Sequence, residues 1–243
     1  MKFTRDCDPS KMILRALAVL LLGSTALLPS PLQLPDRPFR KWAREEALGI
    51  LTNSPWAKQE TYTQVIGGIG SGLSGTKEIY STFFVRFLSA RPVREAFARM
   101  AQIQADYDKM GKDEKREFDS SLDPGLKTDF HRWIVVTLGF RSNDPNVELR
   151  VKQFLEAQST ETMKSRAYLT TTHYQQLELE AYFPPLEDIV GAKFVFPRKI
   201  AGLPVVFPED DMLTFELAVP GFDPDLMVRF DIAGMLIRDE PVL

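Results

Sequence analysis

Near the N-terminus, several basic residues are followed by an apolar run. Residues 16–28 carry no charge, and four basic side chains precede them: Lys2, Arg5, Lys11 and Arg15. As a helix the run would span about 20 Å, which is short of the roughly 30 Å of a bilayer core. Its length matches the apolar part of a secretion signal, and Ser24 and Ala26 are small residues placed for cleavage after Ala26. We therefore expect residues 1–26 to be a signal peptide.

The same run allows two alternatives. Extended back to Met12 it has 17 residues with Arg15 at one end, which fits an uncleaved membrane anchor. Met12 is also an alternative translation start, because residues 1–11 are long and mixed in charge for the basic region of a signal. We expect export to the periplasm or the medium, with an N-terminal anchor as the alternative. A proline-rich linker is expected over residues 27–38.

Helical spacing of apolar residues begins after the linker. Phe39, Ala43, Ala47 and Ile50 predict a short helix that ends at residues 53–55. Later in the chain, Asp144-Pro145 predicts the N-cap and first turn of a second helix. The apolar stripe of this second helix consists of Val147, Val151, Phe154 and Leu155.

The longest predicted helix begins at Arg91-Pro92, because proline suits a first helical turn. Its mostly apolar stripe consists of Val93, Phe97, Met100, Gln104, Tyr107 and Met110, and Gly111 ends it. The charged residues 112–118 predict a second, short helix. We interpret Asp123-Pro124-Gly125 as a turn.

Alternation with a period of two predicts strands in both halves of the chain. In residues 79–89, Phe83 and Phe87 lie on one face and Phe84 and Leu88 on the other, so both faces are expected to be covered. The other predicted strands are residues 61–66, 130–140, 167–172, 176–183, 192–197, 204–207, 212–219 and 226–232.

These elements predict an α+β fold. The N-terminal half is mixed, with one long helix packed on strands, and the C-terminal half is antiparallel, β-rich and sandwich-like. We expect a single domain over residues 39–243, with its β-rich part at residues 165–243. A sub-boundary near residue 160 is the alternative.

Charge and cysteine content narrow the function classes. The chain has 30 basic and 33 acidic side chains, and residues 27–243 have 26 and 31. This balance argues against a nucleic-acid partner, because proteins that bind nucleic acid carry a basic face. Cys7 is the only cysteine and precedes the expected cleavage site. The exported part is therefore expected to have no disulfide and no thiol chemistry.

The segment Gly70-x-Gly72-x-x-Gly75 formally matches the dinucleotide fingerprint. That chemistry needs a helix directly after the glycines, so that the helix N-terminus meets the pyrophosphate. Here residues 79–88 are β-branched and aromatic and predict a strand. We therefore interpret the segment as a hairpin loop and predict no cofactor.

Two histidines and one acidic cluster are the remaining candidates for chemistry. His131 and His173 are far apart in sequence and occur in no zinc-binding spacing, so a structural or surface role is favoured for each. Glu209, Asp210 and Asp211 are adjacent acids that lack calcium-loop spacing, and we expect them to be solvated. No catalytic, cofactor-binding or metal-binding residue is predicted.

Three segments resemble a group of exported bacterial proteins of uncharacterised activity. They are Lys41-Trp42 with residues 50–58 (ILTNSPWAK), residues 89–96 (SARPVREA) and residues 192–197 (AKFVFP). The sequence FRKW at residues 39–42 also resembles proteins with a GWxTD domain, although the GWxTD motif itself is absent. The resemblance implies export and a bacterial source, and it implies no activity and no site residues.

The function favoured by the sequence is that of an exported, non-catalytic binding or scaffolding protein of the bacterial envelope, with an envelope protein as its partner. Two alternatives stay open. One is an exported hydrolase that uses Glu209, Asp210 and Asp211 with His131 or His173 nearby. The other is a small-ligand carrier that uses the space between the sheet and the long helix. A membrane contact is expected only through an uncleaved signal anchor.

Overall fold

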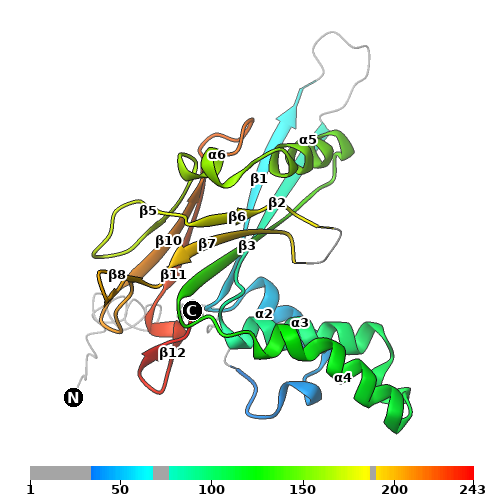
Figure 1. The fold of residues 1–243 in the computed structure, drawn as a ribbon. Helices are drawn as coiled ribbons and strands as arrows, with labels where there is room; N and C mark the ends of the chain where they lie inside the picture. The colour runs from blue at the N-terminus through cyan, green and yellow to red at the C-terminus, as the bar shows by residue number, and fades with distance from the viewer. Residues whose placement is uncertain (1–33, 68–76, 187–189) are drawn as a thin grey trace, which may run out of the picture. The chain divides into compact units, whose positions relative to one another are not determined.

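The five-stranded antiparallel sheet is the centre of the structure, a computed structural model that describes residues 34–67, 77–186 and 190–243. The predicted signal peptide and the glycine-rich residues 70–75 lie outside the described residues. The strand order of this sheet is β1-β2-β3-β7-β6 (Figure 1). Its strands are β1 (Ala57–Ile66), β2 (Lys77–Phe87), β3 (Trp133–Ser142), β7 (Ala192–Pro197) and β6 (Ala181–Phe183).

A second antiparallel sheet has the order β11-β10-β4-β5. Its strands are β4 (Ala167–Thr170), β5 (Leu177–Glu178), β10 (Met212–Leu217) and β11 (Leu226–Asp231). Two short ribbons accompany it, β8 (Lys199–Ile200) with β9 (Leu203–Pro204) and β12 (Leu236–Ile237) with β13 (Glu240–Pro241). The α+β, largely antiparallel fold predicted from the sequence is confirmed.

The two sheets pack face to face through phenylalanine rings. Phe194 of β7 lies 5.2 Å from Phe215 of β10, and Phe87 of β2 lies 4.8 Å from Phe230 of β11, in T-shaped contacts between ring centroids. All four side chains are fully buried. Large aromatic surfaces contribute strongly to such a core. We call the side of the five-stranded sheet that makes these contacts its inner face, and the opposite side its outer face.

The prediction of one continuous strand over residues 176–183 is wrong, because the structure has two short strands there. The chain forms β5 in one sheet and β6 in the other, so it crosses between the sheets after Glu178. Leu177, Leu179 and Tyr182 are all buried, which keeps much of the alternation in the sequence. Alternation identifies the buried side chains but not the pairing partner, so the pattern could not reveal the crossing.

Strands from both halves of the chain build the five-stranded sheet. β7 pairs with β3 from Trp133↔Pro197 to Leu138↔Ala192, and β6 pairs with β7. The mixed N-terminal half and the β-rich C-terminal half therefore share one sheet. The described residues form a single compact unit.

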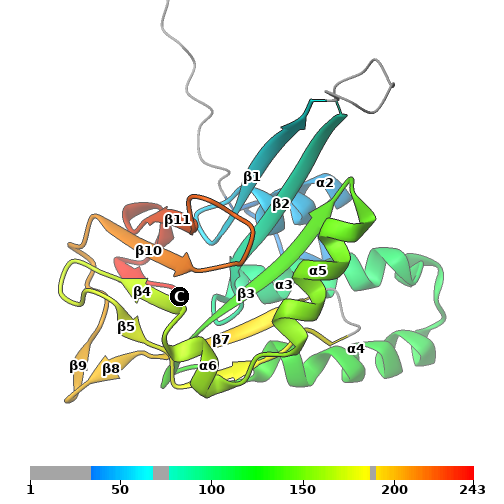
Figure 2. The same ribbon diagram turned by 90° about the horizontal axis from the view of Figure 1, so that it is seen from above.

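Most helices lie on the side of the five-stranded sheet away from the second sheet (Figure 2). They are α2 (Arg44–Thr52), α3 (Arg91–Gln104), α4 (Lys112–Lys127), α5 (Pro145–Glu156) and α6 (Thr160–Lys164), with 3₁₀ turns η1 (Phe39–Lys41), η2 (Tyr107–Lys109) and η3 (Ala233–Met235). α2 packs on α3 and on β1 and β2. α5 packs against β3, where Glu148 accepts hydrogen bonds from Arg141 and Ser142 at the end of that strand.

The expected longest helix and the expected turn at residues 123–125 are both corrected. α3 has 14 residues and ends at Gln104, because Asp106 adopts a left-handed conformation before Gly111 is reached. α4 has 16 residues and contains Pro124 in its last turn. Proline removes one helical hydrogen bond, but α4 has no buried residue, so water can satisfy the freed carbonyl of Ser120.

Gly191 marks a close approach between the β6–β7 connection and β3. Its φ is +89°, and a Cβ placed on it would lie 2.2 Å from the carbonyl oxygen of Leu138. Gly202, in the tight turn between β8 and β9, also has a positive φ of +84°, but a Cβ there would meet no atom within 4 Å. Both glycines therefore have a left-handed backbone conformation, but only at Gly191 would a side chain collide with a neighbouring strand.

We predict that Gly202→Ala lowers the free energy of unfolding by about 1–2 kcal/mol, the cost of a left-handed conformation. Gly191→Ala should lose that amount and a further ~1–3 kcal/mol, because its methyl group forces β3 and the connection apart. Urea unfolding followed by tryptophan fluorescence measures both. Equal losses for the two variants would show that Gly191 does not determine the contact with β3.

Candidate functional site

A groove of about 450 Å³ lies over the outer face of the five-stranded sheet. Its volume is within the range of roughly 300–1,000 Å³ that small-molecule sites occupy. Four separate parts of the chain contribute to its lining, which includes Leu48 and Thr52 of α2; Phe84 and Arg86 of β2; Gly139 and Arg141 of β3 together with Glu148, Lys152 and Leu155 of the directly following α5; and Pro185, Leu186 and Gly191.

The walls of the groove are mainly apolar. Leu48 of α2 is 46% exposed and Leu186 is 69% exposed, so two large aliphatic side chains meet solvent at its rim. Leu155 is buried on the α5 side, and Phe84 forms part of the floor. Exposed apolar side chains that gather around a concavity commonly mark a binding surface.

Arg86 is the charged residue at the floor. Only 9% of it is exposed, and its Nε donates a hydrogen bond of 2.7 Å to the carbonyl oxygen of Leu51 in α2. Its guanidinium carbon lies 5.2 Å from the ring centroid of Phe84 and 5.7 Å from that of Phe97 in α3. Burial lowers the pKa of Arg86 to about 10, so the side chain still carries its charge at neutral pH.

No ion pair of Arg86 occurs within residues 34–67, 77–186 and 190–243. Arg99, which is equally buried, has the carboxylate of Asp108 at 3.6 Å. A buried charge without an opposite charge is costly, and most proteins pair it. Among the described residues, the Leu51 carbonyl and the two aromatic rings are the compensation of Arg86.

Gly139 keeps the space beside Arg86 open. It is paired with Phe84 across the β2–β3 ladder, and a Cβ at this position would lie 3.4 Å from Nη1 of Arg86. Any larger side chain would cover the guanidinium. The glycine therefore leaves one side of the charge accessible from the groove.

The second charged group of the groove is an ion pair at its rim. Arg141 donates to Glu148 at 2.8 Å, and Glu148 also accepts a 3.1 Å bond from the backbone N–H of Ser142. That backbone bond, and then Arg141, lower the pKa of Glu148. Glu148 is thus held as a carboxylate that is already engaged, which makes it a poor general acid.

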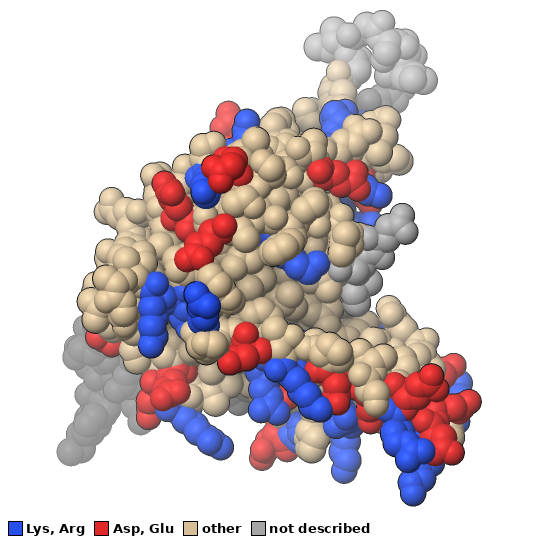
Figure 3. Space-filling model, viewed as in Figure 1, with Lys and Arg blue, Asp and Glu red and all other residues tan. Residues whose placement is uncertain are grey.

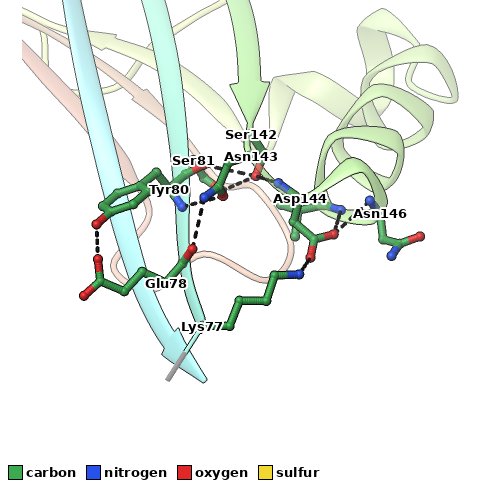
Figure 4. A network of polar contacts seen from close by, with 9 residues as sticks. Lys77, Glu78, Tyr80, Ser81, Ser142, Asn143, Asp144 and Asn146 are labelled. Carbon is green, nitrogen blue, oxygen red and sulfur yellow. Dashed lines mark hydrogen bonds and ion pairs between the residues drawn. The ribbon is translucent and has the colours of Figure 1, made fainter. Parts of the chain in front are cut away.

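A polar network fixes the start of α5, and so the α5 wall of the groove (Figure 4). Asp144 accepts bonds from the backbone N–H groups of Asn146 and Val147, which confirms it as the N-cap. Lys77 of β2 donates to Asp144 at 2.7 Å. Asn143 accepts from the backbone of Tyr80 at 2.8 Å and donates to that of Glu78. The end of the β1–β2 hairpin is thereby tied to α5.

The structure separates the candidates for chemistry predicted from the sequence. His131 is exposed and lies 2.7 Å from Asp129. His173 lies 3.1 Å from Asp210, whose second carboxylate oxygen accepts the backbone N–H of Phe207. Asp210 is buried, whereas its neighbours Glu209 and Asp211 are exposed.

Neither histidine lines the groove. In the described part of the chain, no three His, Cys, Asp or Glu side chains gather as metal ligands.

The glycine-rich segment lies in the sequence between β1 and β2, the two strands of a hairpin. β1 and β2 pair antiparallel up to Ile66↔Lys77, so the element after the glycines is a strand. A dinucleotide site needs a helix at that position in the chain, and β2 takes its place. Residues 70–75 themselves lie outside the described residues.

Sequence reasoning missed Arg86. A signal for it existed, since the alternation in β2 places Arg86 on the same face as Phe84, the face predicted to be covered. A basic residue at a covered position of a central strand is unusual and points to a partner or a ligand.

Charges of both signs mix on the surface over α4, and no one sign dominates the face in Figure 3. That nucleic acid is not a partner stays a prediction from the sequence. Among the described helices, none has the length and hydropathy that a membrane crossing requires.

Comparisons with protein-family models, with curated proteins and with solved structures found no match to this chain. The resemblance to exported bacterial proteins stays a prediction.

Asp144 gives the site a predicted pH dependence. The hydrogen bond from Lys77, and then the backbone N–H of Asn146, hold the pKa of Asp144 below its ordinary value of 3.8. A lowered pKa in the folded state means that the stabilisation is complete above pH 3.8 and is lost as the pH falls through the folded-state value. The free energy of unfolding should therefore fall as the pH is lowered below 3.8.

The measurement compares urea unfolding of the wild type and of Asp144→Asn between pH 2.5 and pH 7. We expect the difference in stability between them to be largest at neutral pH and to shrink in acid, because both chains then carry an uncharged side chain at position 144. A difference that is constant over this range would contradict the assigned role of the Lys77–Asp144 pair.

Proposed function

We propose that this chain is an exported, non-catalytic binding protein of the bacterial envelope and that the groove between α2 and α5 is its binding site. The observation that carries the proposal is the groove itself, with apolar walls and one buried charge on its floor. Binding sites for small molecules have this composition, a mostly apolar lining with few polar groups that orient the ligand.

The geometry favours the small-ligand alternative among the functions considered from the sequence. The groove lies over the sheet between α2 and α5, whereas the sequence predicts such a site between the sheet and the helix that begins at Arg91-Pro92. No residue of α3 is part of the described lining, and α3 acts on the groove through the contact of Phe97 with Arg86. An envelope protein that delivers or receives the ligand is compatible with this site.

The hydrolase alternative has one observation in its favour, the contact between His173 and Asp210. The two other acids that it needs point to solvent, because Glu209 and Asp211 are exposed while Asp210 is buried between them. Glycosidic chemistry requires two carboxyl groups that face each other across a cleft. The acids of this loop alternate in direction, so the arrangement favours binding over hydrolysis.

Export rests on the sequence. The uncharged run at residues 16–28 and the small residues before position 27 support a cleaved signal, and an uncleaved anchor is the alternative. In either case the groove would act outside the cytoplasm.

The groove is tested with the neutral apolar dye N-phenyl-1-naphthylamine, whose fluorescence rises on binding. We predict that the full chain binds the dye and that Leu48→Gln weakens binding about tenfold, because a buried leucine contact is worth roughly 1.5–3 kcal/mol. The matched control is Leu149→Gln. Leu149 is 52% exposed on α5, close to the 46% of Leu48, and does not line the groove.

Equal weakening by the two substitutions would place the dye elsewhere on the surface. No binding by the folded wild-type chain would remove the support for the groove as a binding site. Circular dichroism of each variant checks that the fold is kept.

A further inference from the structure

We propose that the ligand of the groove is an aliphatic monocarboxylate, whose carboxylate pairs with Arg86 and whose chain lies along the apolar walls. This inference rests on the proposed function and names the chemical class of the ligand. Charge complementarity carries it, because the floor offers one buried positive charge that no described carboxylate meets.

Arg86 is held in a fixed position for such a contact. Its Nε is occupied by the carbonyl oxygen of Leu51, and its guanidinium carbon lies 5.2 Å from the ring centroid of Phe84 and 5.7 Å from that of Phe97. This leaves the terminal Nη1 and Nη2 groups as the donors without a described partner. An arginine presents these nitrogens as a rigid fork that matches the two oxygens of a carboxylate. A side chain already held in this way loses little conformational entropy on binding.

Access to the fork depends on Gly139. Glycine has no side chain that could block the guanidinium, whereas a Cβ at this position would lie 3.4 Å from Nη1. An oxygen atom of a ligand can therefore approach the guanidinium from the groove. The surrounding low-polarity environment strengthens a charge-assisted hydrogen bond formed there.

A single negative charge fits the site better than a phosphate. The groove contains two further cationic side chains, but Arg141 is paired with Glu148 at 2.8 Å and Lys152 lies 3.7 Å from Glu156. Arg86 is thus the one cation of the described lining without a carboxylate partner. A phosphate group carries up to two charges and usually recruits several donors.

The remainder of the ligand is an aliphatic chain, because leucine side chains on the walls of the groove would pack against it. Leu48, Leu155 and Leu186 offer methyl groups to a chain, and the mainly apolar lining is a poor match for a peptide backbone, whose polar groups need hydrogen-bond partners. Each buried methylene adds about 0.8 kcal/mol of favourable transfer free energy. A chain of moderate length therefore gains affinity from the walls while Arg86 fixes its orientation.

The test uses ligands that share one chain and differ in the head group, each titrated against the naphthylamine dye bound to the full chain. They are dodecanoate, 1-dodecanol and dodecyl phosphate. We expect dodecanoate to displace the dye at a concentration about tenfold or more below that of 1-dodecanol, as befits a hydrogen bond to a charged group. This comparison needs no substitution and is independent of any effect on folding.

Variants then assign the preference to Arg86. In Arg86→Gln, dodecanoate and 1-dodecanol should become equal within about twofold, whereas Arg229→Gln, an exposed arginine on β11 outside the groove, should keep the wild-type preference. Gly139→Ala leaves the charge in place but narrows access to Nη1, and should weaken dodecanoate more than 1-dodecanol. This second variant decides the matter if Arg86→Gln does not fold.

Three outcomes would overturn the inference. Equal affinity of the wild type for dodecanoate and 1-dodecanol, with both weakened by Leu48→Gln, would keep the groove as a site but remove the role of Arg86. A preference for dodecyl phosphate would replace the carboxylate with a phosphate. Failure of the dye and of all three ligands to bind would overturn the proposed function as well.

Discussion

The burial of the C-terminal end of β2 on both faces is the constraint on which the rest of the structure depends. On the inner face, Phe83 and Phe87 pack into the core shared with the second sheet. On the outer face, Arg86 is also buried and contacts α2 and α3. A central strand covered on one side only would leave α2 and α3 without a surface to pack on. The double coverage therefore fixes both the sandwich and the position of the groove.

The groove exists because the cover of the outer face is incomplete. α2 reaches it from one side and α5 from the other. The network around Asp144 fixes α5, and Gly191 lets the β6–β7 connection approach β3. Four separate parts of the chain thus meet around a space that none of them fills. The buried charge of Arg86 is the chemical feature of that space, and its partial compensation by aromatic rings leaves it available to an anion.

The local patterns of the sequence are reliable where one short-range rule decides the outcome. Alternation identifies the inner face of β2, and Asp144-Pro145 identifies the start of α5, because side-chain direction and N-capping depend on neighbours only. The same kind of rule misleads at Pro124, where an exposed helix accommodates a proline that suggests a turn. The pattern of acids at residues 209–211 predicts one solvated cluster, yet packing buries Asp210 against His173.

The sequence by itself determined the α+β class, most strand positions, the acidic charge balance and the expectation of export, since these depend on composition and periodicity. Only the tertiary structure decided that β6 and β7 complete the sheet of β1, β2 and β3, and that Arg86 lies beneath a groove. Strand pairing and the surroundings of a buried charge depend on contacts between residues far apart in the chain. Periodicity carries no record of such contacts, which is why the candidate site could not be predicted from the sequence.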